Sequence, residues 1–380
     1  MADRISRLPL ELVLHILSYL PFDALLSFGA TSRTNYRCHI LGLKRLRLGV
    51  FERRVHSMIS CLQAGWATAD QVGSGLDTED IGRDYIVSVI QPRTRLPTPD
   101  LPSRSSFSPS KDPRRRIPAP GARGTRARTH EQMVRLQNRI FARVVNRYGP
   151  SLVKLEFMAY DLDAEGAQAL GTQCRNSLRH LALRFEHQHI RDGNMRPSTW
   201  LHPAPSSPAW NMLLGIGSHE HLGVFGLETL ILERAGITAW QLMTLVRRNP
   251  RLRTLKLRTC RGAQPEFLNW LGGIEKDPEA KEDEAVPGQR LETLWLEHCH
   301  RLLPESVGEY AFLPEEDCDA GLEWVRGLKN LKSLSFNECM NIPSEYVERA
   351  NKVVWNIPEV ILPYSLEAES SSIEVDPTLR

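Results

Sequence analysis

Hydrophobic positions along this chain follow two different patterns. From residue 8 to residue 36, leucines and other apolar residues crowd so closely that a helix made from them is apolar nearly all round. From residue 152 onward, leucines recur as Leu-x-x-Leu-x-Leu with long gaps between copies. A helix that is apolar on several sides needs more than one surface to bury it. The first pattern therefore predicts short docking helices, and the second predicts repeated short strands.

Prolines and capping residues divide the first pattern into three short helices. Pro9 falls near the first helical position, where a missing N–H costs little, and Pro21 ends that helix. Asp23 is predicted to cap a second helix over 24–30, and Ser32 to begin a third. Because a unit of about 40 residues is marginal at burying a core alone, we expect another protein to supply a second surface.

These residues resemble the F-box in order and spacing. The resemblance rests on Leu8-Pro9-x-Glu11-Leu12, Ile16-Leu17, Leu20-Pro21, Leu25-Leu26 and Ser32-Arg33 with the aromatic Tyr36. Thr31 stands where valine is usual, and Tyr36 where tryptophan is commoner. The resemblance implies binding to a Skp-type adaptor and, through it, to a cullin. The residues that it implies bind the adaptor, or support that binding, are Leu8, Pro9, Leu12, Ile16, Leu17, Leu20, Pro21 and Leu25.

The leucine motif occurs in six copies, which start 25 to 49 residues apart. A Leu-x-Leu step suits one face of a strand, whereas the third leucine falls well off a helical stripe. The shorter spacings lie in the range of leucine-rich repeats. The copies begin at Leu152, Leu178, Leu227, Leu252, Leu291 and Leu331.

The last three copies each carry a cysteine shortly after the motif, at Cys260, Cys299 and Cys339. This arrangement resembles cysteine-containing leucine-rich repeats, which implies that each cysteine packs inside the turn after its strand. The long spacings imply insertions over 187–222 and 275–289, and a degenerate repeat could lie within 184–226.

Helices are expected between the strands. Asp163 is predicted to cap a helix over 164–174, Thr238 and Gln241 to form a capping box, and Pro265 to open a helix that ends at residue 271. Residues 131–148 also have a helical pattern, with one apolar stripe at Met133, Leu136, Ile140 and Val144. Residues 41–66 continue a helical pattern too, which serves either as a connector stiffening the F-box or as an ordinary core helix.

A basic segment separates the two patterns. Residues 91–130 are rich in proline, serine and arginine, so they cannot bury enough apolar surface to offset their ordering entropy, and we expect them to be disordered. This segment could bind RNA, acidic partners or an import receptor, but a solvated linker is the simpler interpretation, because only Phe107 could stack on a base. Nucleic acid is therefore an unlikely partner.

The sequence thus predicts an α+β or α/β solenoid chain. A three-helix F-box bundle (1–48) and a helical connector (49–90) precede the disordered basic segment (91–130). A helix and an irregular leucine-rich-repeat solenoid follow (131–363), with parallel strands on the concave face. An acidic tail (364–380) is expected to be disordered.

Composition narrows the cellular setting. The 380 residues contain no run of 18 apolar residues, so no membrane span is expected, and the first residues lack the layout of a signal peptide. Seven cysteines without a Cys-x-x-Cys argue against a disulfide scaffold. A reducing compartment, the cytoplasm or the nucleus, fits best.

Candidate chemistry is sparse. Residues 297–300 (Glu-His-Cys-His) superficially resemble metal ligands, but neighbours on a strand alternate faces and cannot converge on one tetrahedral ion without a sharp turn. Neither a glycine-rich phosphate loop nor a Gly-x-Ser-x-Gly or His-Glu-x-x-His motif occurs. We therefore expect no catalytic residue, no metal and no cofactor.

The positions between the motif leucines should face the groove of the solenoid. Trp295 is a candidate hot spot, unless an insert of the chain covers it. Four cations in this set could read a phosphate if adjacent strands bring them together. The substrate-binding candidates are Arg184, Arg234, Lys256, Arg258, Trp295 and Glu297.

The resemblance implies a non-catalytic substrate receptor of an SCF-type cullin-RING ubiquitin ligase. The N-terminal helices would bind the Skp-type adaptor, the repeats would bind an unidentified protein substrate, and the ligase would act by proximity. The alternative is a non-degradative interaction scaffold whose basic segment binds nucleic acid or an acidic partner.

Overall fold

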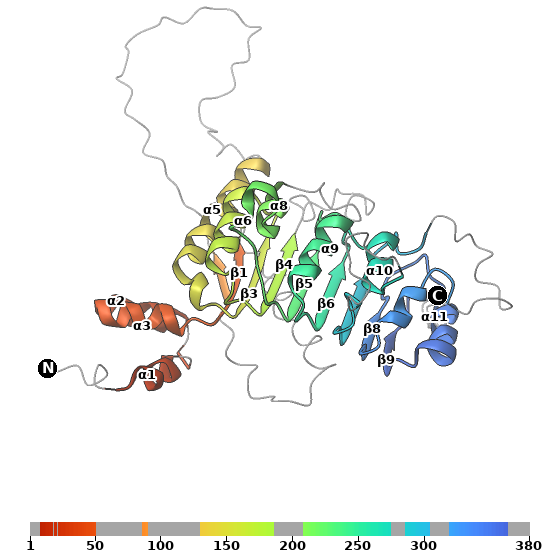
Figure 1. Cartoon of the computed structure of the whole chain (residues 1–380). Coiled ribbons are helices and arrows are strands. Elements are labelled where there is room, and N and C mark those ends of the chain that lie inside the picture. The colour runs from red at the N-terminus through yellow and green to blue at the C-terminus, as the bar shows by residue number, and fades with distance from the viewer. Residues whose placement is uncertain are drawn as a thin grey trace, which may run out of the picture.

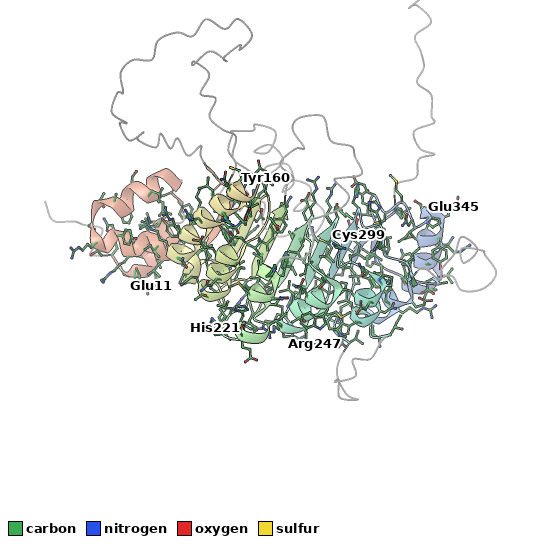
Figure 2. The ribbon with its side chains drawn as sticks, turned by 90° about the horizontal axis from the view of Figure 1, so that it is seen from above. Glu11, Tyr160, His221, Arg247, Cys299 and Glu345 are labelled. Carbon is green, nitrogen blue, oxygen red and sulfur yellow. The ribbon has the colours of Figure 1, made fainter. Side chains whose placement is uncertain are left out.

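The computed structural model describes residues 8–17, 19–20, 22–50, 86–89, 130–185, 208–274, 286–304 and 319–363. Within these ranges, parallel strands form one sheet in the order β2-β1-β3-β4-β5-β6-β7-β8-β9. Helices cover one face of this sheet, and three N-terminal helices lie at one end (Figure 1). Figure 2 shows Glu11 and Glu345 at opposite ends of an elongated molecule. The predicted combination of N-terminal helices and a parallel α/β sheet is confirmed.

The elements alternate along most of the chain. The helices are α1 Leu10–Leu17, α2 Phe22–Thr31, α3 Arg33–Gly42, α5 His130–Tyr148, α6 Ala164–Gln173, α8 Pro208–Leu214, α9 Ala239–Arg248, α10 Pro265–Leu271 and α11 Ser344–Ala350. The strands are β1 Arg45–Val50, β2 Ile86–Val89, β3 Lys154–Ala159, β4 His180–Phe185, β5 Thr229–Glu233, β6 Thr254–Arg258, β7 Thr293–Glu297, β8 Ser333–Ser335 and β9 Glu359–Ile361.

The three N-terminal helices begin largely where the sequence predicts. The carbonyl of Pro9 accepts a hydrogen bond from the Val13 amide, which starts α1. The Ser32 hydroxyl accepts from the Asn35 amide at 3.1 Å and caps α3. Asp23 is not the cap of α2, because that helix already begins at Phe22. The residue instead lies in the first turn of α2.

The leucine motifs lie on neighbouring strands in one register. The middle leucines of the six copies are aligned across β3 to β8, and each is at most 1% exposed. A fully buried leucine contributes about 1.5 to 3 kcal/mol, so this row is a main source of stability. The aligned residues are Leu155, Leu181, Leu230, Leu255, Leu294 and Leu334.

The predicted helical connector is wrong where the structure describes it. Residues 45–50 form strand β1, in which Leu46 pairs with Leu155 and Leu48 with Phe157. Leu43, Leu46 and Leu48 are thus a seventh copy of the leucine motif, and all three are buried. Residues 86–89 form a second strand, β2, beside β1. The domain boundary predicted after residue 48 falls inside β1, and residues 51–85 lie outside the described residues.

Helix α5 is present, but its buried stripe differs from the predicted one. Met133 is buried as expected, whereas Leu136, Ile140 and Val144 are only half-buried. The buried stripe runs one residue further along, through Gln137, Phe141, Val145 and Tyr148. The polar Gln137 can be buried on this stripe because its Oε1 accepts a hydrogen bond from the Tyr160 amide at 2.9 Å.

No strand of the sheet separates β4 from β5, which pair directly. The expectation of a degenerate repeat between them is therefore wrong for the sheet. Residues 208–214 of the predicted insertion form helix α8, which packs between α6 and α9. Three of its side chains, Trp210, Leu213 and Leu214, join the core. Residues 186–207 and 275–285 lie outside the described residues, as do 90–129 and 364–380.

The three cysteines of the later motifs are buried, as the sequence predicts. The thiol of Cys260 donates to the Leu232 carbonyl at 3.2 Å, and that of Cys339 to the Leu296 carbonyl at 2.8 Å. Cys299 makes the equivalent bond to Leu257 at 3.7 Å. Burial raises the pKa of Cys299 to about 11 and that of Cys339 to about 12. These groups therefore stay protonated and link each turn to the preceding strand.

Helix caps and a buried asparagine close the loops between helices and strands. Asp163 caps α6, and Thr238 with Gln241 forms the predicted capping box of α9. Asn249, only 1% exposed, follows α9. Its amide nitrogen donates to the Val224 and Leu245 carbonyls, and its amide oxygen accepts from the Leu227 amide at 2.9 Å. One side chain thus holds the end of α9 to the loop that leads into β5.

Replacing Asn249 by alanine should lower the free energy of unfolding by about 3 kcal/mol, because buried backbone groups lose their partners. Urea titration followed by circular dichroism measures this change. Asn146→Ala, at an exposed position of α5, is the matched control and should change the free energy by less than about 0.5 kcal/mol. Equal effects of both substitutions would contradict the role given to Asn249.

Candidate functional site

An exposed apolar stripe runs along α1. Leu8, Leu12 and Ile16, spaced four residues apart, are 40%, 51% and 50% exposed. Leu12 and Ile16 lie on one face of α1, and Leu8 stands two residues before that helix begins. We call these three residues the α1 stripe. Tyr19 follows them and is also exposed, although sequence reasoning gave it no role.

The opposite side of α1 packs inside the bundle. Leu17 is 2% exposed, Leu25 of α2 is fully buried, and Leu20 is half-buried. Leu17 lies against Gly42 of α3, where an added Cβ would be 3.3 Å from the leucine Cβ. Of the predicted adaptor-binding residues, these three therefore support the stripe, whereas Pro9 and the α1 stripe itself are exposed. Pro21 lies outside the described residues.

Hydrogen bonds fasten the N-terminal helices to the sheet. The Ser151 hydroxyl, just before β3, lies 2.8 Å from the Ile40 carbonyl and 3.0 Å from the Leu43 carbonyl. The Lys44 carbonyl accepts from the amides of Val153 and Lys154. Because α3 leads directly into β1, the α1 stripe is held in a fixed position relative to the sheet.

A buried histidine completes this junction. Nδ1 of His39 lies 2.6 Å from the Tyr36 carbonyl and must donate to it, so Nε2 accepts from the Tyr148 hydroxyl at 3.3 Å. Burial lowers the pKa of His39, and the nearby Arg147 guanidinium lowers it further. Gly29 packs so closely on the ring that an added Cβ would be 2.4 Å from Nδ1. The histidine is therefore held neutral between α2, α3 and α5.

The face of the sheet opposite the motif leucines carries the predicted substrate-binding residues of the strands. Pairing places Lys256 beside Trp295 and Arg258 beside Glu297, on β6 and β7. The Lys256 ammonium lies 3.4 Å from the centre of the Trp295 ring, whose Nε1 donates to the Ser333 hydroxyl at 3.1 Å. Trp295 is half-buried between these neighbours. The structure therefore brings these four candidates together.

Two of the four cations in the predicted phosphate-reading patch are paired with carboxylates. Arg184 forms an ion pair with Glu233 at 3.3 Å, and Arg258 with Glu338 at 2.9 Å. Arg234 follows β5 with a positive φ of 53°, and its main-chain amide donates to the Arg258 carbonyl. The two ion pairs reduce the excess positive charge of the predicted patch.

The pKa values of two carboxyl groups on this face shift in opposite directions. Burial raises the pKa of Glu297, against the lowering effect of Arg258 and Lys256. Burial also raises the pKa of Glu156, but its hydrogen bond with His180 and the nearby arginines outweigh that effect and lower it. Arg47 of β1 lies 3.6 Å from Glu156. This ion pair between neighbouring strands was not predicted, because β1 was expected to be helical.

The side chains of residues 298–300 have other contacts in the structure. Nε2 of His300 lies 3.1 Å from Nδ1 of His298, so the two rings bond to each other. Cys299 points into the core. Over the described part of the chain, no group of three metal-ligating side chains converges, and no helix is long and apolar enough to cross a membrane.

Comparison with known proteins identifies one region. Residues 5–38 match the F-box-like family, which confirms the F-box predicted in the N-terminal helices and covers α1, α2 and most of α3. No curated protein matches the chain. The F-box-like match implies binding to a Skp-type adaptor.

The buried histidines predict a pH dependence of stability. Burial lowers the pKa of both His39 and His180 below the ordinary value of 6.5. The unfolded chain then binds more protons as the pH falls below 6.5, so the free energy of unfolding decreases. Urea titrations at about pH 7.5 and about pH 5.5 measure this loss. This loss of unfolding free energy should be smaller for His39→Asn. An unchanged loss would show that His39 does not contribute to the pH dependence.

Proposed function

We propose that this chain is the substrate receptor of an SCF-type cullin-RING ubiquitin ligase. The observation that carries the proposal is the α1 stripe, three exposed apolar side chains within an F-box-like region. Such a patch on a short helix is a typical protein-binding surface. The Skp-type adaptor occupies it and connects the chain to the cullin.

The sheet belongs, in this proposal, to an irregular leucine-rich-repeat solenoid. Seven motif copies on parallel strands in one register, with buried cysteines after the later ones, support that assignment. The face opposite the motif leucines binds the protein substrate. Trp295 is the proposed anchor, because a half-buried tryptophan flanked by charged residues has the character of a binding hot spot.

The receptor needs no acid, base or nucleophile of its own under this proposal. It places a substrate lysine near a ubiquitin thioester that other subunits carry, so its contribution is proximity and orientation. The fixed junction at Ser151 and His39 supports this role, because it holds the substrate-binding face at a constant position relative to the adaptor. Action in the cytoplasm or nucleus is consistent with this role.

Ile16→Asp should abolish copurification of the adaptor and the cullin with the tagged full-length chain. The substitution places a charge within the α1 stripe, at a side chain that is half exposed, so the fold should survive. Leu17→Asp is a poorer test, because that side chain is 2% exposed and its loss would unfold the bundle. Mass spectrometry of the purified samples measures the result.

Trp240→Asp is the matched control. Trp240 is 55% exposed on α9, away from α1, so it tests whether the loss of any exposed apolar residue has the same effect. This variant should retain both subunits. Adaptor and cullin at wild-type amounts with folded Ile16→Asp would refute the assignment of α1 as the binding surface.

Trp295→Ala should separate the two proposed surfaces. We expect this variant to keep the adaptor and the cullin but to lose at least part of the substrate proteins. The reason is that the substitution removes the indole that lies beside Lys256 on the sheet. The comparison uses quantitative mass spectrometry of wild type and Trp295→Ala. If every copurifying protein persists at wild-type amounts, the substrate is bound elsewhere.

A further inference from the structure

A row of alternating charges crosses the edge of the sheet where the strands begin. Each member directly precedes a strand, and each amide after the first donates to the carbonyl of the preceding member, from Glu228 onto Arg179 through to Lys332 onto Glu292. We call these residues the edge row. Its members are Arg179, Glu228, Arg253, Glu292 and Lys332.

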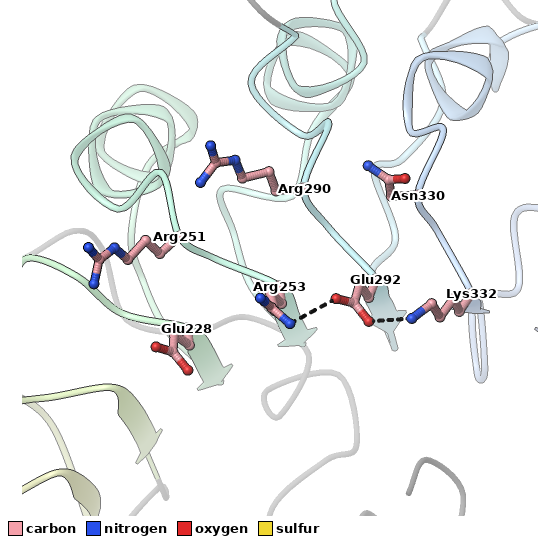
Figure 3. A pocket seen from close by; sticks show the side chains of 7 residues that line it. All are labelled: Glu228, Arg251, Arg253, Arg290, Glu292, Asn330 and Lys332. Atoms are coloured by element: carbon pink, nitrogen blue, oxygen red, sulfur yellow. Dashed lines mark hydrogen bonds and ion pairs between the residues drawn. The ribbon is translucent and has the colours of Figure 1, made fainter.

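The two carboxylates of the edge row are neutralised by their neighbours. Glu292 bonds Lys332 at 2.7 Å and Arg253 at 3.4 Å (Figure 3). Glu228 lies 3.9 Å from Arg179. The hydrogen bond from Lys332 lowers the pKa of Glu292, so the carboxylate stays charged near neutral pH. These carboxylates are therefore already matched by cations.

A pocket of about 530 Å³ opens beside this row. Arg251, Arg290 and Asn330 line it from the loops that lead into β6, β7 and β8, each two residues before an edge-row residue (Figure 3). Within the described residues, neither guanidinium has a hydrogen bond or ion pair to another group. The lining contains four cations against two carboxylates, so the pocket has an excess of positive charge.

The geometry fits a phosphate better than a carboxylate. Neighbouring strands are about 4.8 Å apart, so guanidinium groups from adjacent strands can reach one ligand. A phosphate monoester offers three accepting oxygens and close to two charges, enough for two arginine forks, whereas a carboxylate satisfies only one fork fully. The pocket is also much larger than the anion, which leaves room for the residues beside it.

We infer that this pocket, through Arg251 and Arg290, binds a phosphoserine or phosphothreonine side chain of a peptide segment. The inference rests on the proposed function, because it makes such a segment part of the substrate. A peptide is favoured over a nucleic acid because no aromatic side chain lines the pocket, so bases would have nothing to stack on. Arg253, Lys332 and Asn330 supply further donors.

The test uses the full-length chain and degenerate peptide libraries that differ only in one central residue. Fluorescence anisotropy compares phosphoserine or phosphothreonine, unmodified and glutamate peptides. The phosphorylated pool should bind at least tenfold more tightly than either other pool, and inorganic phosphate should compete. Equal binding of the three pools, or no binding of the phosphorylated pool, would overturn the inference.

Paired variants connect the binding to the pocket. Arg251→Gln/Arg290→Gln should weaken phosphopeptide binding at least tenfold, and Arg251→Lys/Arg290→Lys should recover only part of it, because lysine keeps the charge but loses the fork. The control with the same change of net charge is Arg139→Gln/Arg143→Gln on exposed positions of α5. If this control loses as much affinity, non-specific attraction explains the binding and the pocket is not the site.

Two further measurements separate this inference from its alternatives. The first measurement is the binding of a single-stranded RNA oligonucleotide. If the RNA binds as tightly as the phosphopeptides, and the Arg251→Gln/Arg290→Gln variant loses that binding, the ligand of the pocket is a nucleic acid and not a peptide. Ile16→Asp should still bind phosphopeptides, and Arg251→Gln/Arg290→Gln should still copurify with the adaptor. Failure of the pocket and failure of the adaptor surface are thus distinguished.

Discussion

The structure depends on one constraint, the common register of the motif leucines across the parallel strands. Leu46 in β1 pairs with Leu155 in β3, and the alignment continues to Leu334 in β8. Because side chains of a strand alternate between its two faces, fixing the leucines on the helix-covered face also fixes every residue between them on the other face. A shift by one residue would expose the whole core, so the outer positions are equally well determined.

This register brings outward-facing charges into rows, and like charges side by side would destabilise the sheet. The chain avoids this by alternation. Arg184, Glu233, Arg258 and Glu297 are paired in sequence on β4 to β7, and the edge row alternates in the same way. Arg184 and Arg258, which look from the sequence like part of an open phosphate-reading patch, are therefore balanced by carboxylates. Arg251 and Arg290 escape this balance, because both precede their strands in loops at the pocket.

The sequence predicts the regular parts of this fold well, and the errors have identifiable physical causes. Residues 43–48 were assigned to a helix because arginines between leucines fit a helical stripe and a strand equally; pairing with β3 decides between them. The stripe of α5 was misplaced because hydropathy cannot foresee that Gln137 and Asn138 are buried by hydrogen bonds to backbone amides of the loop after β3. The exposed α1 stripe followed from the F-box resemblance, whereas the edge pocket depends on residues from three separate loops.

The junction at β1 matters more for the proposed function than either surface alone. A receptor that acts by proximity loses effective concentration when its two binding surfaces move independently. Here α3 runs into β1 with only Leu43 and Lys44 between them, and the carbonyls of Ile40, Leu43 and Lys44 all accept hydrogen bonds from the residues around β3. Neutral His39 adds a buried contact to α5. The last helix of the F-box-like region thus leads directly into β1, so under the proposed function an adaptor bound to α1 has a defined orientation relative to Trp295.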